Sequence, residues 1–553
     1  MSNAGPADAV SAESTAILND VKASIRAGQL ARATDLARHA LEKGKLVHPL
    51  LLHLRAHWLE EQGRIAEAIE DLRQAVLVAP YDPLAHFAYG EILVKTGDAR
   101  NAVIAFETTA RLRPDYVPAY RQLGFVKCQM GESEAGRSHY EKAVALDPKD
   151  ADSLAGLAEL AQRRGDYAEA RALIDRTFAL NPDHPVANIA LAALHVAKGA
   201  LVRADSLVRK LLANGRIAPP DHAIVMGILG DVRHAQKRYG EAFEAYTAAA
   251  AEKRKLFAPQ YDRPGRETSH SYAIWLADYL QVAPAAAWQA RRGRAAAADG
   301  ARGHVFLVGF PRSGTTLLHN ILVGNPRIAA LQEQGLLFES TRDLLSNDEG
   351  RARLAALGDD EAASYADLYW QRVRQHGVDV RDRIFVDTHP LNSMKLPLAA
   401  RIFPDAKVVF AIRDPRDVVF SCFRRPLAMG PSTFEYLDIE RAARFYDAVM
   451  SLSLSYRDAL GLDWLDLRHE NLVDDFEAQL DALCGFVGIE KTADMRGFAE
   501  LARTRKIQTA SAAQVKRRLN RDGIGLWRNY RRELEPIQPI LRPWVERFLY
   551  PGE

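Results

Sequence analysis

A short segment near the middle of the chain has the residue types and spacing that bind an oxyanion. It reads HVFLVGFPRSGTTLLHNILVGNP, an apolar run, a glycine-bounded turn and then helical apolar spacing. Such a turn directs backbone N–H groups and the positive end of the helix dipole at one point, which suits phosphate or sulfate. Gly309, Gly314 and Thr316 fit the P-loop spacing, but Thr315 replaces the phosphate-binding lysine. The positive charge lies instead at Arg312, whose planar guanidinium can hold an oxyanion from the side.

A second basic motif follows another predicted strand. In AKVVFAIRDPRDVVFSCFRR, Arg413 stands at the strand end, and Ser421 and Arg425 come eight and twelve residues later. Ser421 and Arg425 lie one above the other on a helix, so with Arg413 they could bind a second, dianionic phosphate. Arg416 and Asp417 could equally be solvated charges at the helix start, and Arg424 a surface residue, so we leave these three out of the site.

The two motifs carry a family resemblance. FPRSGTT after a strand resembles the 5′-phosphosulfate loop of sulfotransferases, which use 3′-phosphoadenosine-5′-phosphosulfate (PAPS) as donor, and the second motif is similar to their 3′-phosphate motif. The resemblance implies a donor site formed by Arg312, Ser313, Gly314, Thr315, Thr316, Arg413, Ser421 and Arg425.

The resemblance also implies catalytic residues. In the tyrosylprotein branch the base is a glutamate, and its counterpart here is Glu333, 21 residues after Arg312. A lone glutamate is usually a solvated surface residue, so this role comes from the resemblance. The C-terminal segment TASAAQVKRRLNRDGIGLWRNY is similar to bacterial repeat-bearing sulfotransferases and places Ser511 at the serine that assists the transition state. The catalytic set is then Glu333, Ser511 and Arg312, and further nucleotide contacts fall on His469, Gln514, Arg517 and Asn520.

The sequence also departs from the family pattern. Thr388 stands where the family has a lysine that stabilises the leaving group, and His389 or Lys395 could reach the same oxygen. His469 replaces the tyrosine expected near the adenine. Losing one electrostatic stabiliser commonly costs about 10²–10³ in rate, so we expect donor binding with slow turnover.

The first half of the chain is a repeat of 34 residues. Prolines recur at Pro80, Pro114, Pro148 and Pro182, and glycines at Gly63, Gly97, Gly131, Gly165 and Gly199. This period is the signature of the tetratricopeptide repeat, a pair of helices per unit. We predict six to seven units forming an all-α superhelix whose groove holds a peptide or protein segment.

The second half alternates apolar strands with amphipathic helices, which predicts a parallel sheet with helices on both faces. The predicted fold is therefore a two-domain protein, a tetratricopeptide-repeat superhelix followed by an α/β, P-loop-like, parallel-sheet sulfotransferase domain. We assign 1–15 to a disordered leader, 16–255 to the repeats, 256–303 to a connector and 304–553 to the sulfotransferase domain.

Composition excludes several classes of protein. A net charge of +2 over 553 residues gives no reason to expect a nucleic-acid binder. Three scattered cysteines form no disulfide framework or metal site, and the N-terminus has no secretory signal. No apolar run approaches the roughly 20 residues that span a bilayer. We expect a cytoplasmic protein.

These observations predict a PAPS-dependent enzyme that moves a sulfuryl group to a hydroxyl without a metal. The repeats favour an acceptor on a peptide or protein, with tyrosine as one candidate. Carbohydrate or small-metabolite acceptors, and a repeat scaffold with a catalytically degenerate nucleotide-binding domain, remain alternatives. A nucleotide kinase would need the lysine that Thr315 replaces.

Overall fold

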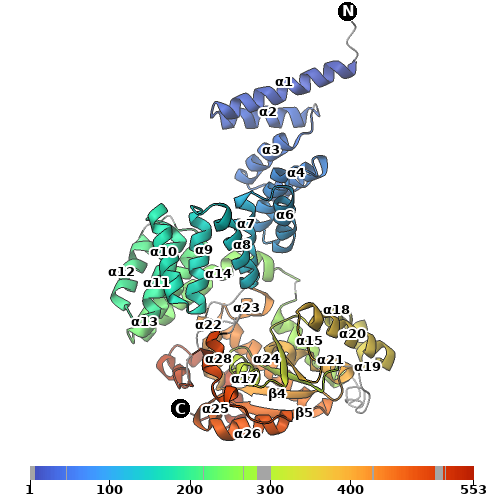
Figure 1. Ribbon diagram of the computed structural model, residues 1–553, viewed down its shortest axis with the longest axis vertical. Coiled ribbons are helices and arrows are strands. Elements are labelled where there is room, and N and C mark those ends of the chain that lie inside the picture. The colour runs from blue at the N-terminus through green and yellow to red at the C-terminus, as the bar shows by residue number, and fades with distance from the viewer. Residues whose placement is uncertain are drawn as a thin grey trace, which may run out of the picture. The chain divides into compact units, whose positions relative to one another are not determined.

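The computed structural model describes residues 6–44, 46–213, 215, 217–265, 267–282, 300–425, 429–504, 515–516 and 519–552. The chain divides into two units (Figure 1). The first comprises residues 1–161 and 167–190, and the second comprises residues 162–166 and 191–553.

The first unit is entirely helical within its described residues, and successive helices pack as pairs. It contains α1 (Pro6–Arg26), α2 (Leu30–Glu42), α3 (Pro49–Glu61), α4 (Ile65–Val78), α5 (Pro83–Lys95), α6 (Ala99–Leu112), α7 (Val117–Gln129), α8 (Ser133–Leu146), α9 (Ala151–Arg164), α10 (Tyr167–Leu180) and the start of α11 (Pro185–Ala197). The predicted all-helical repeat region is confirmed.

The repeated glycines have a backbone reason. Gly63, Gly97 and Gly131 end the turns between paired helices with φ of 73°, 81° and 83°, a region that glycine enters without a steric penalty. Within a pair, a Cβ on Gly90 would lie 2.6 Å from the ring of Phe106, which is fully buried. The small and bulky positions of the repeat therefore pack directly against each other.

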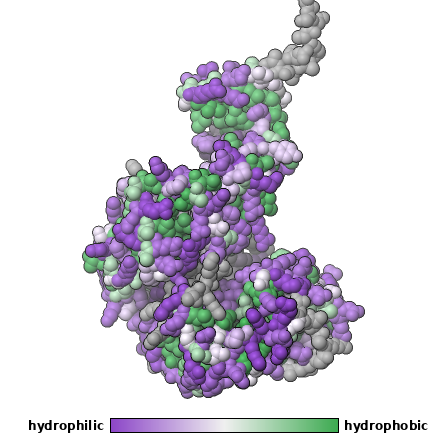
Figure 2. Space-filling model, viewed as in Figure 1, coloured by the Kyte–Doolittle hydropathy of each residue, from purple (hydrophilic) through white to green (hydrophobic). Residues whose placement is uncertain are grey.

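Large apolar side chains also remain on the outside of this unit. Leu77, Tyr81 and Ile104 are more than half exposed. Figure 2 shows hydrophobic residues among the hydrophilic ones on the visible face of the first repeats. Isolated exposed apolar residues are ordinary in folded proteins, so they identify no ligand by themselves.

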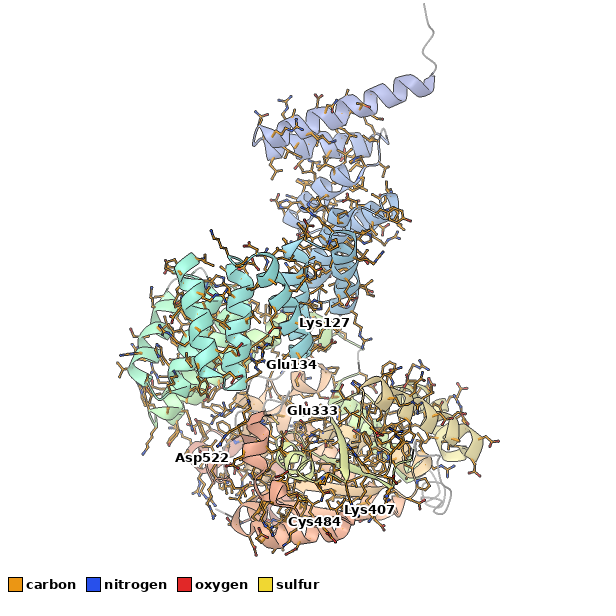
Figure 3. All side chains as sticks on the ribbon, viewed as in Figure 1. Lys127, Glu134, Glu333, Lys407, Cys484 and Asp522 are labelled. Carbon is orange, nitrogen blue, oxygen red and sulfur yellow. The ribbon has the colours of Figure 1, made fainter. Side chains whose placement is uncertain are left out.

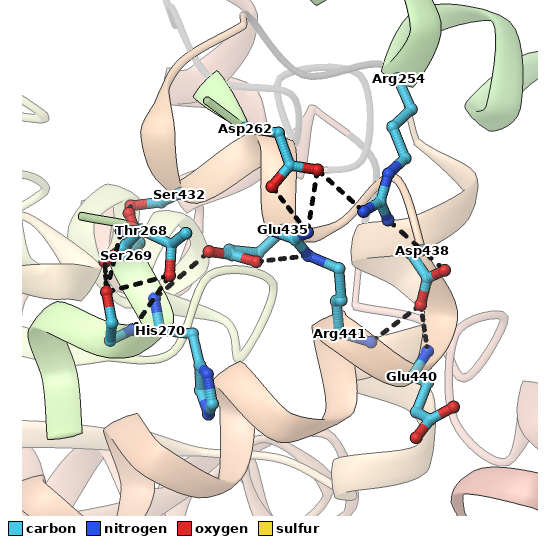
Figure 4. Close-up of polar contacts among 11 residues, drawn as sticks. Arg254, Asp262, Thr268, Ser269, His270, Ser432, Glu435, Asp438, Glu440 and Arg441 are labelled. Atoms are coloured by element: carbon cyan, nitrogen blue, oxygen red, sulfur yellow. Dashed lines mark hydrogen bonds and ion pairs between the residues drawn. The ribbon is translucent and has the colours of Figure 1, made fainter. Parts of the chain in front are cut away.

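The second unit begins with the last repeat helices and continues into an α/β domain. The repeat helices are the rest of α11, α12 (Leu201–Ala213), α13 (Pro219–Ala235) and α14 (Tyr239–Tyr261), followed by α15 (Ser269–Val282). Ion pairs join α14 and Asp262, just after it, to the start of α24 (Ile439–Leu460), and α24 is joined in turn to α23 (Pro431–Glu435), as Figure 4 shows. Arg441 binds both Asp262 and Glu435, and Arg254 binds Asp262 and Asp438.

A five-stranded parallel sheet forms the centre of this unit. The strands are β1 (Gly303–Gly309), β2 (Ile328–Gln332), β3 (Ile384–Thr388), β4 (Lys407–Ile412) and β5 (Asp463–Arg468), in the order β2-β3-β1-β4-β5. The chain builds one side of β1 first and then crosses to the other, so the loops after β1 and β4 diverge and leave room for a ligand. The predicted parallel α/β domain is confirmed.

Helices cover both faces of the sheet, because the buried strands are apolar on both sides. One face packs against α17 (Thr315–Leu322) and α26 (Phe476–Val487), where Leu318 and Leu483 join the strand residues. The other face packs against α20 (Asp359–Gln375), α21 (Leu396–Ile402), α22 (Pro415–Arg424) and α24, and its core continues into Tyr246 of the repeat helix α14.

The remaining elements complete this unit. They are α18 (Phe338–Leu344), α19 (Asp348–Ala356), α20 (Asp359–Gln375), η1 (Pro390–Lys395), α21 (Leu396–Ile402), α22 (Pro415–Arg424), α25 (His469–Asp474), α27 (Ala493–Arg496), α28 (Phe498–Thr504), η2 (Leu526–Tyr530), η3 (Glu535–Ile537) and α30 (Gln538–Arg547). Among the described residues, no helix is long and apolar enough to cross a membrane.

Candidate functional site

The predicted site residues come from strand ends that all lie at one edge of the sheet. Glu333 directly follows β2, Thr388 ends β3, Arg413 follows β4 and His469 follows β5, while Arg312 lies in the loop after β1. Figure 3 labels Glu333 and Lys407. Glu333 follows the carboxyl end of β2, whereas Lys407 begins β4 and so lies at the amino-terminal edge of the sheet. Parallel pairing therefore gathers side chains that are more than 150 residues apart in the sequence.

The loop after β1 requires unusual backbone conformations. Gly309 has φ of 151°, and a Cβ there would lie 2.6 Å from the carbonyl oxygen of Ala411 on β4. Gly314 has φ of 106° and precedes the first turn of α17, so the loop N–H groups and the helix N-terminus face the same region. Arg312 also has a positive φ, 72°, which is uncommon for a residue with a side chain.

The structure brings the two basic motifs together. The Arg312 Nε donates to the Ser421 hydroxyl at 3.1 Å, and the Arg413 guanidinium donates to the Arg312 carbonyl at 3.0 Å. Ser313, Thr315 and Thr316 are buried in the same loop and first helical turn.

The electrostatics of this cluster favour an anion. Burial, and then the charges of Arg425 and Arg413, lower the pKa of Arg312 to about 10. Burial and the charge of Arg424 lower the pKa of Arg425. Within the described residues, the buried Arg413 Nε has no hydrogen-bond partner. Several desolvated guanidinium groups thus repel each other, and a bound anion would relieve that repulsion.

His469 lies beside the anion-binding loop as a neutral imidazole. A Cβ on Gly314 would lie 3.1 Å from the His469 Nδ1, so the ring closely approaches the loop backbone. Burial, and then Arg413 and Arg312, lower the pKa of His469 to about 3. An uncharged flat ring is suited to contact a base rather than a phosphate.

Glu333 has a strained backbone and a perturbed carboxyl group. Its φ is 54°, and its N–H donates to the Thr388 carbonyl at 2.7 Å, which extends the β2–β3 ladder by one bond. The residue is exposed to solvent, yet protein atoms crowd its carboxyl. This partial desolvation raises the pKa of Glu333, and the nearby Arg312 offsets part of the rise. A basic carboxylate that water and an acceptor can both reach is suited to take a proton.

Thr388, which stands where the family resemblance expects a lysine, has a histidine partner and other titratable residues near it in the sequence. Thr388 is fully buried, and its hydroxyl lies 2.9 Å from the Nδ1 of His319 on α17. Burial and then Lys395 lower the pKa of His389 to about 4. Burial also lowers the pKa of Lys395, and the nearby Asp387 offsets part of that fall. The sequence did not predict a role for His319 in this region, because its partner Thr388 lies 69 residues away.

The predicted C-terminal contacts lie only partly in the described chain. Ser511, Gln514 and Arg517 lie outside the described residues. Asn520 is described, and its side chain accepts from the N–H of Asp522 at 3.1 Å. The next residue, Gly523, accepts from Arg413 through its carbonyl oxygen.

The side chains of Trp527 and Arg424 are both buried. Trp527 is buried, and the guanidinium carbon of Arg416 lies 3.7 Å from its ring centroid. The interpretation of Arg424 as a surface residue is wrong, because only 6% of its side chain is exposed. The charges at the start of this helix, Arg416 and Asp417, are buried as well and not solvated. Their neighbours in the sequence gave no means of predicting this burial.

A cavity of about 510 Å³ lies next to α17 and β2. Its lining includes His319 and Gln332 but none of the clustered arginines. The arginine cluster, rather than this cavity, therefore defines the site.

Comparisons with known proteins agree with this arrangement. Residues 304–494 match the model of the Sulfotransferase family, and residues 53–117, 139–172 and 163–216 match models of the tetratricopeptide repeat. Over 252 residues the chain is 23% identical to a Caenorhabditis briggsae protein named "Putative protein-tyrosine sulfotransferase", covering 43% of this chain and 86% of that protein.

Other relatives match smaller shares of their own length. An uncharacterised protein of Aquifex aeolicus is 25% identical over 255 residues, which cover 44% of this chain and 33% of that protein. The CTR9 homologue of Arabidopsis thaliana is 33% identical over 75 residues, which cover 14% of this chain and only 7% of that protein.

Solved structures match the repeats weakly. A tetratricopeptide repeat protein from Parabacteroides merdae is 17% identical, with a TM-score of 0.35, and the match covers 43% of this chain and 92% of that one. MamA is 19% identical, with a TM-score of 0.27, over 29% of this chain and 94% of that one. With TM-scores this low, neither likeness supports an inference.

The fold is a parallel α/β domain that gathers a cluster of arginines at the carboxyl ends of its strands. The chain carries tetratricopeptide repeats and a sulfotransferase family domain, and it is a distant relative of the Caenorhabditis protein.

Proposed function

We propose that this protein transfers a sulfuryl group from PAPS to a hydroxyl acceptor. The observation that carries the proposal is the contact between the two basic motifs, in which Arg312 of the first loop binds Ser421 of the second motif. The 5′-phosphosulfate and the 3′-phosphate of the donor would together neutralise this buried positive cluster.

In the proposed reaction, the acceptor oxygen attacks sulfur while the bond between sulfur and the bridging phosphate oxygen breaks. Glu333 takes the acceptor proton, and Arg312 with the loop N–H groups stabilises the charge that develops on the bridging oxygen. The products are the sulfated acceptor and 3′-phosphoadenosine-5′-phosphate (PAP). Ser511 keeps its predicted role in assisting this step, and Gln514 and Arg517 keep theirs in covering the nucleotide.

A peptide or protein hydroxyl is the proposed acceptor, with tyrosine as the first candidate. Two observations support it: the repeat helices and the relative named as a protein-tyrosine sulfotransferase. A carbohydrate or small hydroxylated metabolite would use the same donor chemistry and belongs in the same screen.

A repeat scaffold with a degenerate domain is the second candidate function. It is favoured by Thr388, which is fully buried and bonded to His319 where the family resemblance expects a lysine. Such a protein would bind PAP but turn over no PAPS.

We also propose a reducing, cytoplasmic location. None of Cys128, Cys422 and Cys484 forms a disulfide, which supports this location.

The first experiment is calorimetric titration of PAP into the full-length protein without metal. Arg312→Asn and Arg413→Gln should each weaken binding about 10–150-fold, because each removes charge-assisted bonds. Asparagine is chosen at position 312 because it tolerates a positive φ better than alanine.

The matched control is Arg302→Gln. Arg302 is exposed and precedes β1, at the opposite end of the sheet from the loop, so the substitution removes the same charge without touching the site. No PAP binding by a folded wild-type protein would contradict the proposal. If PAP binds, release of PAP from PAPS with tyrosine peptides, sugars and small phenols then separates the enzyme from the scaffold.

A further inference from the structure

Arg424, at the end of the helix that carries Ser421, has buried N–H groups that no described residue satisfies. Its Nε and Nη1 atoms are enclosed and have no hydrogen-bond partner among the described residues. Its Nη2 atom lies 3.5 Å from the Asp231 carboxylate, which is long for a charge-assisted bond. A guanidinium left this poorly satisfied in the interior is costly unless a further anion binds it.

The surroundings of Arg424 fix its position. Its guanidinium carbon lies 5.6 Å from the ring centroid of Tyr246 and 5.8 Å from that of Phe420. The Tyr246 hydroxyl donates to Asp231 at 2.8 Å. Asp231 and Tyr246 belong to α13 and α14, the last repeat pair, so the repeats hold this arginine on one side.

The helix that bears Arg424 is also fixed against α14 by aromatic side chains. Phe243 of α14 lies 5.4 Å from Phe423 and 6.5 Å from Phe420, measured between ring centroids. Phe420 in turn lies 4.2 Å from Tyr530. α22 therefore cannot shift without disturbing the last repeat pair, and Ser421 lies on this same helix.

Arg424 acts electrostatically on the anion site. Its charge contributes to lowering the pKa of both Arg425 and Arg312, so it lies within range of the proposed phosphate positions. The nearest carboxylate, Asp231, already accepts the Tyr246 hydroxyl and is on the repeat side. Arg424 lies three residues after Ser421, one helical turn along α22, and is next to Arg425, so its two unsatisfied N–H groups belong to the same end of this helix as the second basic motif.

We propose that Arg424 is an additional binding residue for the 3′-phosphate of the donor, and that Asp231 of the last repeat pair is its positioning residue. The inference rests on the proposed function, since it names a further part of the same donor site. In this proposal the last repeat pair helps to bind the donor, because its Asp231 positions Arg424. This role is separate from any role of the repeats in holding an acceptor.

The test measures PAP and 5′-AMP binding to the full-length protein by calorimetry. 5′-AMP lacks the 3′-phosphate, so a residue that recognises this group should distinguish the two ligands. We expect Arg424→Gln to weaken PAP binding about 10-fold or more and to change 5′-AMP binding, measured at millimolar concentration, less than about 3-fold.

Two further variants keep this test falsifiable. Arg424→Lys retains the charge and should recover most of the PAP affinity, which also covers the case that Arg424→Gln does not fold. Arg302→Gln is the matched surface control and should bind PAP like the wild type. An equal loss for PAP and 5′-AMP in Arg424→Gln would show a purely structural role and overturn the inference. If the wild type binds PAP and Arg424→Gln binds it equally well, only this inference fails; if the wild type does not bind, the proposed function fails.

The positioning role of Asp231 has its own readout. Asp231→Asn should weaken PAP binding about 3-fold in the wild-type background and have no further effect in Arg424→Gln, because Asp231 acts through Arg424. Tighter PAP binding by Asp231→Asn would show that the carboxylate only offsets charge, and that result would overturn the positioning role.

Discussion

At the residue scale, the site is marked by two residues whose backbone conformations are unfavourable for their type. Arg312 and Glu333 both have positive φ, a conformation that persists in a residue with a side chain only where the surrounding structure imposes it. In Arg312 the imposed turn brings the side chain to Ser421, and in Glu333 it ends a strand next to the arginine cluster. Strain at both positions is consistent with a preorganised active site.

Glu333→Gln should lower the transfer rate about 10²–10⁴-fold without a comparable loss of PAP affinity. A general base must be deprotonated to act, and partial desolvation by the surrounding protein atoms raises the pKa of Glu333. The rate should therefore fall as pH drops through a pKa above the ordinary glutamate value. The measurement is kcat/KM of the wild type as a function of pH.

Glu339→Gln is the control for this prediction. Glu339 is a nearby carboxylate already bound by Arg372 at 2.7 Å, so its loss should leave the acid limb of the profile in place. An acid limb at the ordinary glutamate pKa, or full activity in Glu333→Gln, would remove Glu333 from the role of base.

At the element scale, the site depends on how closely the strand ends approach each other. The turn after β1 passes so near β4 that only glycine fits at position 309. Glu333 depends on an extra backbone bond between the ends of β2 and β3. The ligand-binding edge is therefore a property of the strand pairing, which fixes the loops before any side chain contributes.

Gly309→Ala should destabilise the protein by about 1–3 kcal/mol and abolish tight PAP binding. The added methyl would meet the Ala411 carbonyl at 2.6 Å and also strain the backbone, so the loop must move. Urea unfolding and PAP titration measure the two effects. Gly335→Ala, where no atom lies within 4 Å of the added Cβ, should leave both unchanged. Wild-type PAP affinity in Gly309→Ala would mean that the loop tolerates the displacement and does not position the donor.

At the scale of the whole molecule, the boundary between the two units does not coincide with the end of the repeats. Apart from residues 162–166, the second unit begins at Leu191 and contains the last repeat helices together with the α/β domain. Tyr246 on α14 belongs to the same hydrophobic core as the sheet. The earlier repeats form a unit with cores of their own. The predicted domain limits remain predictions, but the packing divides the chain inside the repeat array.

This division predicts that damage to the first unit leaves donor binding intact. Phe106→Ala removes a fully buried ring and should destabilise the first unit by about 3–5 kcal/mol. Hydrogen exchange should become faster in α5 and α6 and stay unchanged in β1 and β4, with wild-type PAP affinity. Ile104→Ala on the same helix is the control, because Ile104 is exposed. Loss of PAP binding in Phe106→Ala would show that the first unit supports the donor site.

The sequence by itself determined what depends on local spacing. The 34-residue period set the helix pairs because glycine turns such as Gly63 and small-to-bulky contacts such as Gly90 with Phe106 recur at fixed intervals. The strand-turn-helix pattern around Arg312 and the strand end at Arg413 were predictable for the same reason. A parallel sheet then had to bring strand ends together, which explains why candidate residues from distant segments meet.

The tertiary structure alone decided what depends on contacts between distant segments. Nothing local distinguishes the buried Arg424 from a surface arginine, since its burial comes from Tyr246 and its ion pair from Asp231. The same holds for His319, which meets Thr388 only when α17 packs on the sheet. Burial and charge pairing are properties of the packed chain, whereas turns and periodicities are properties of neighbouring residues.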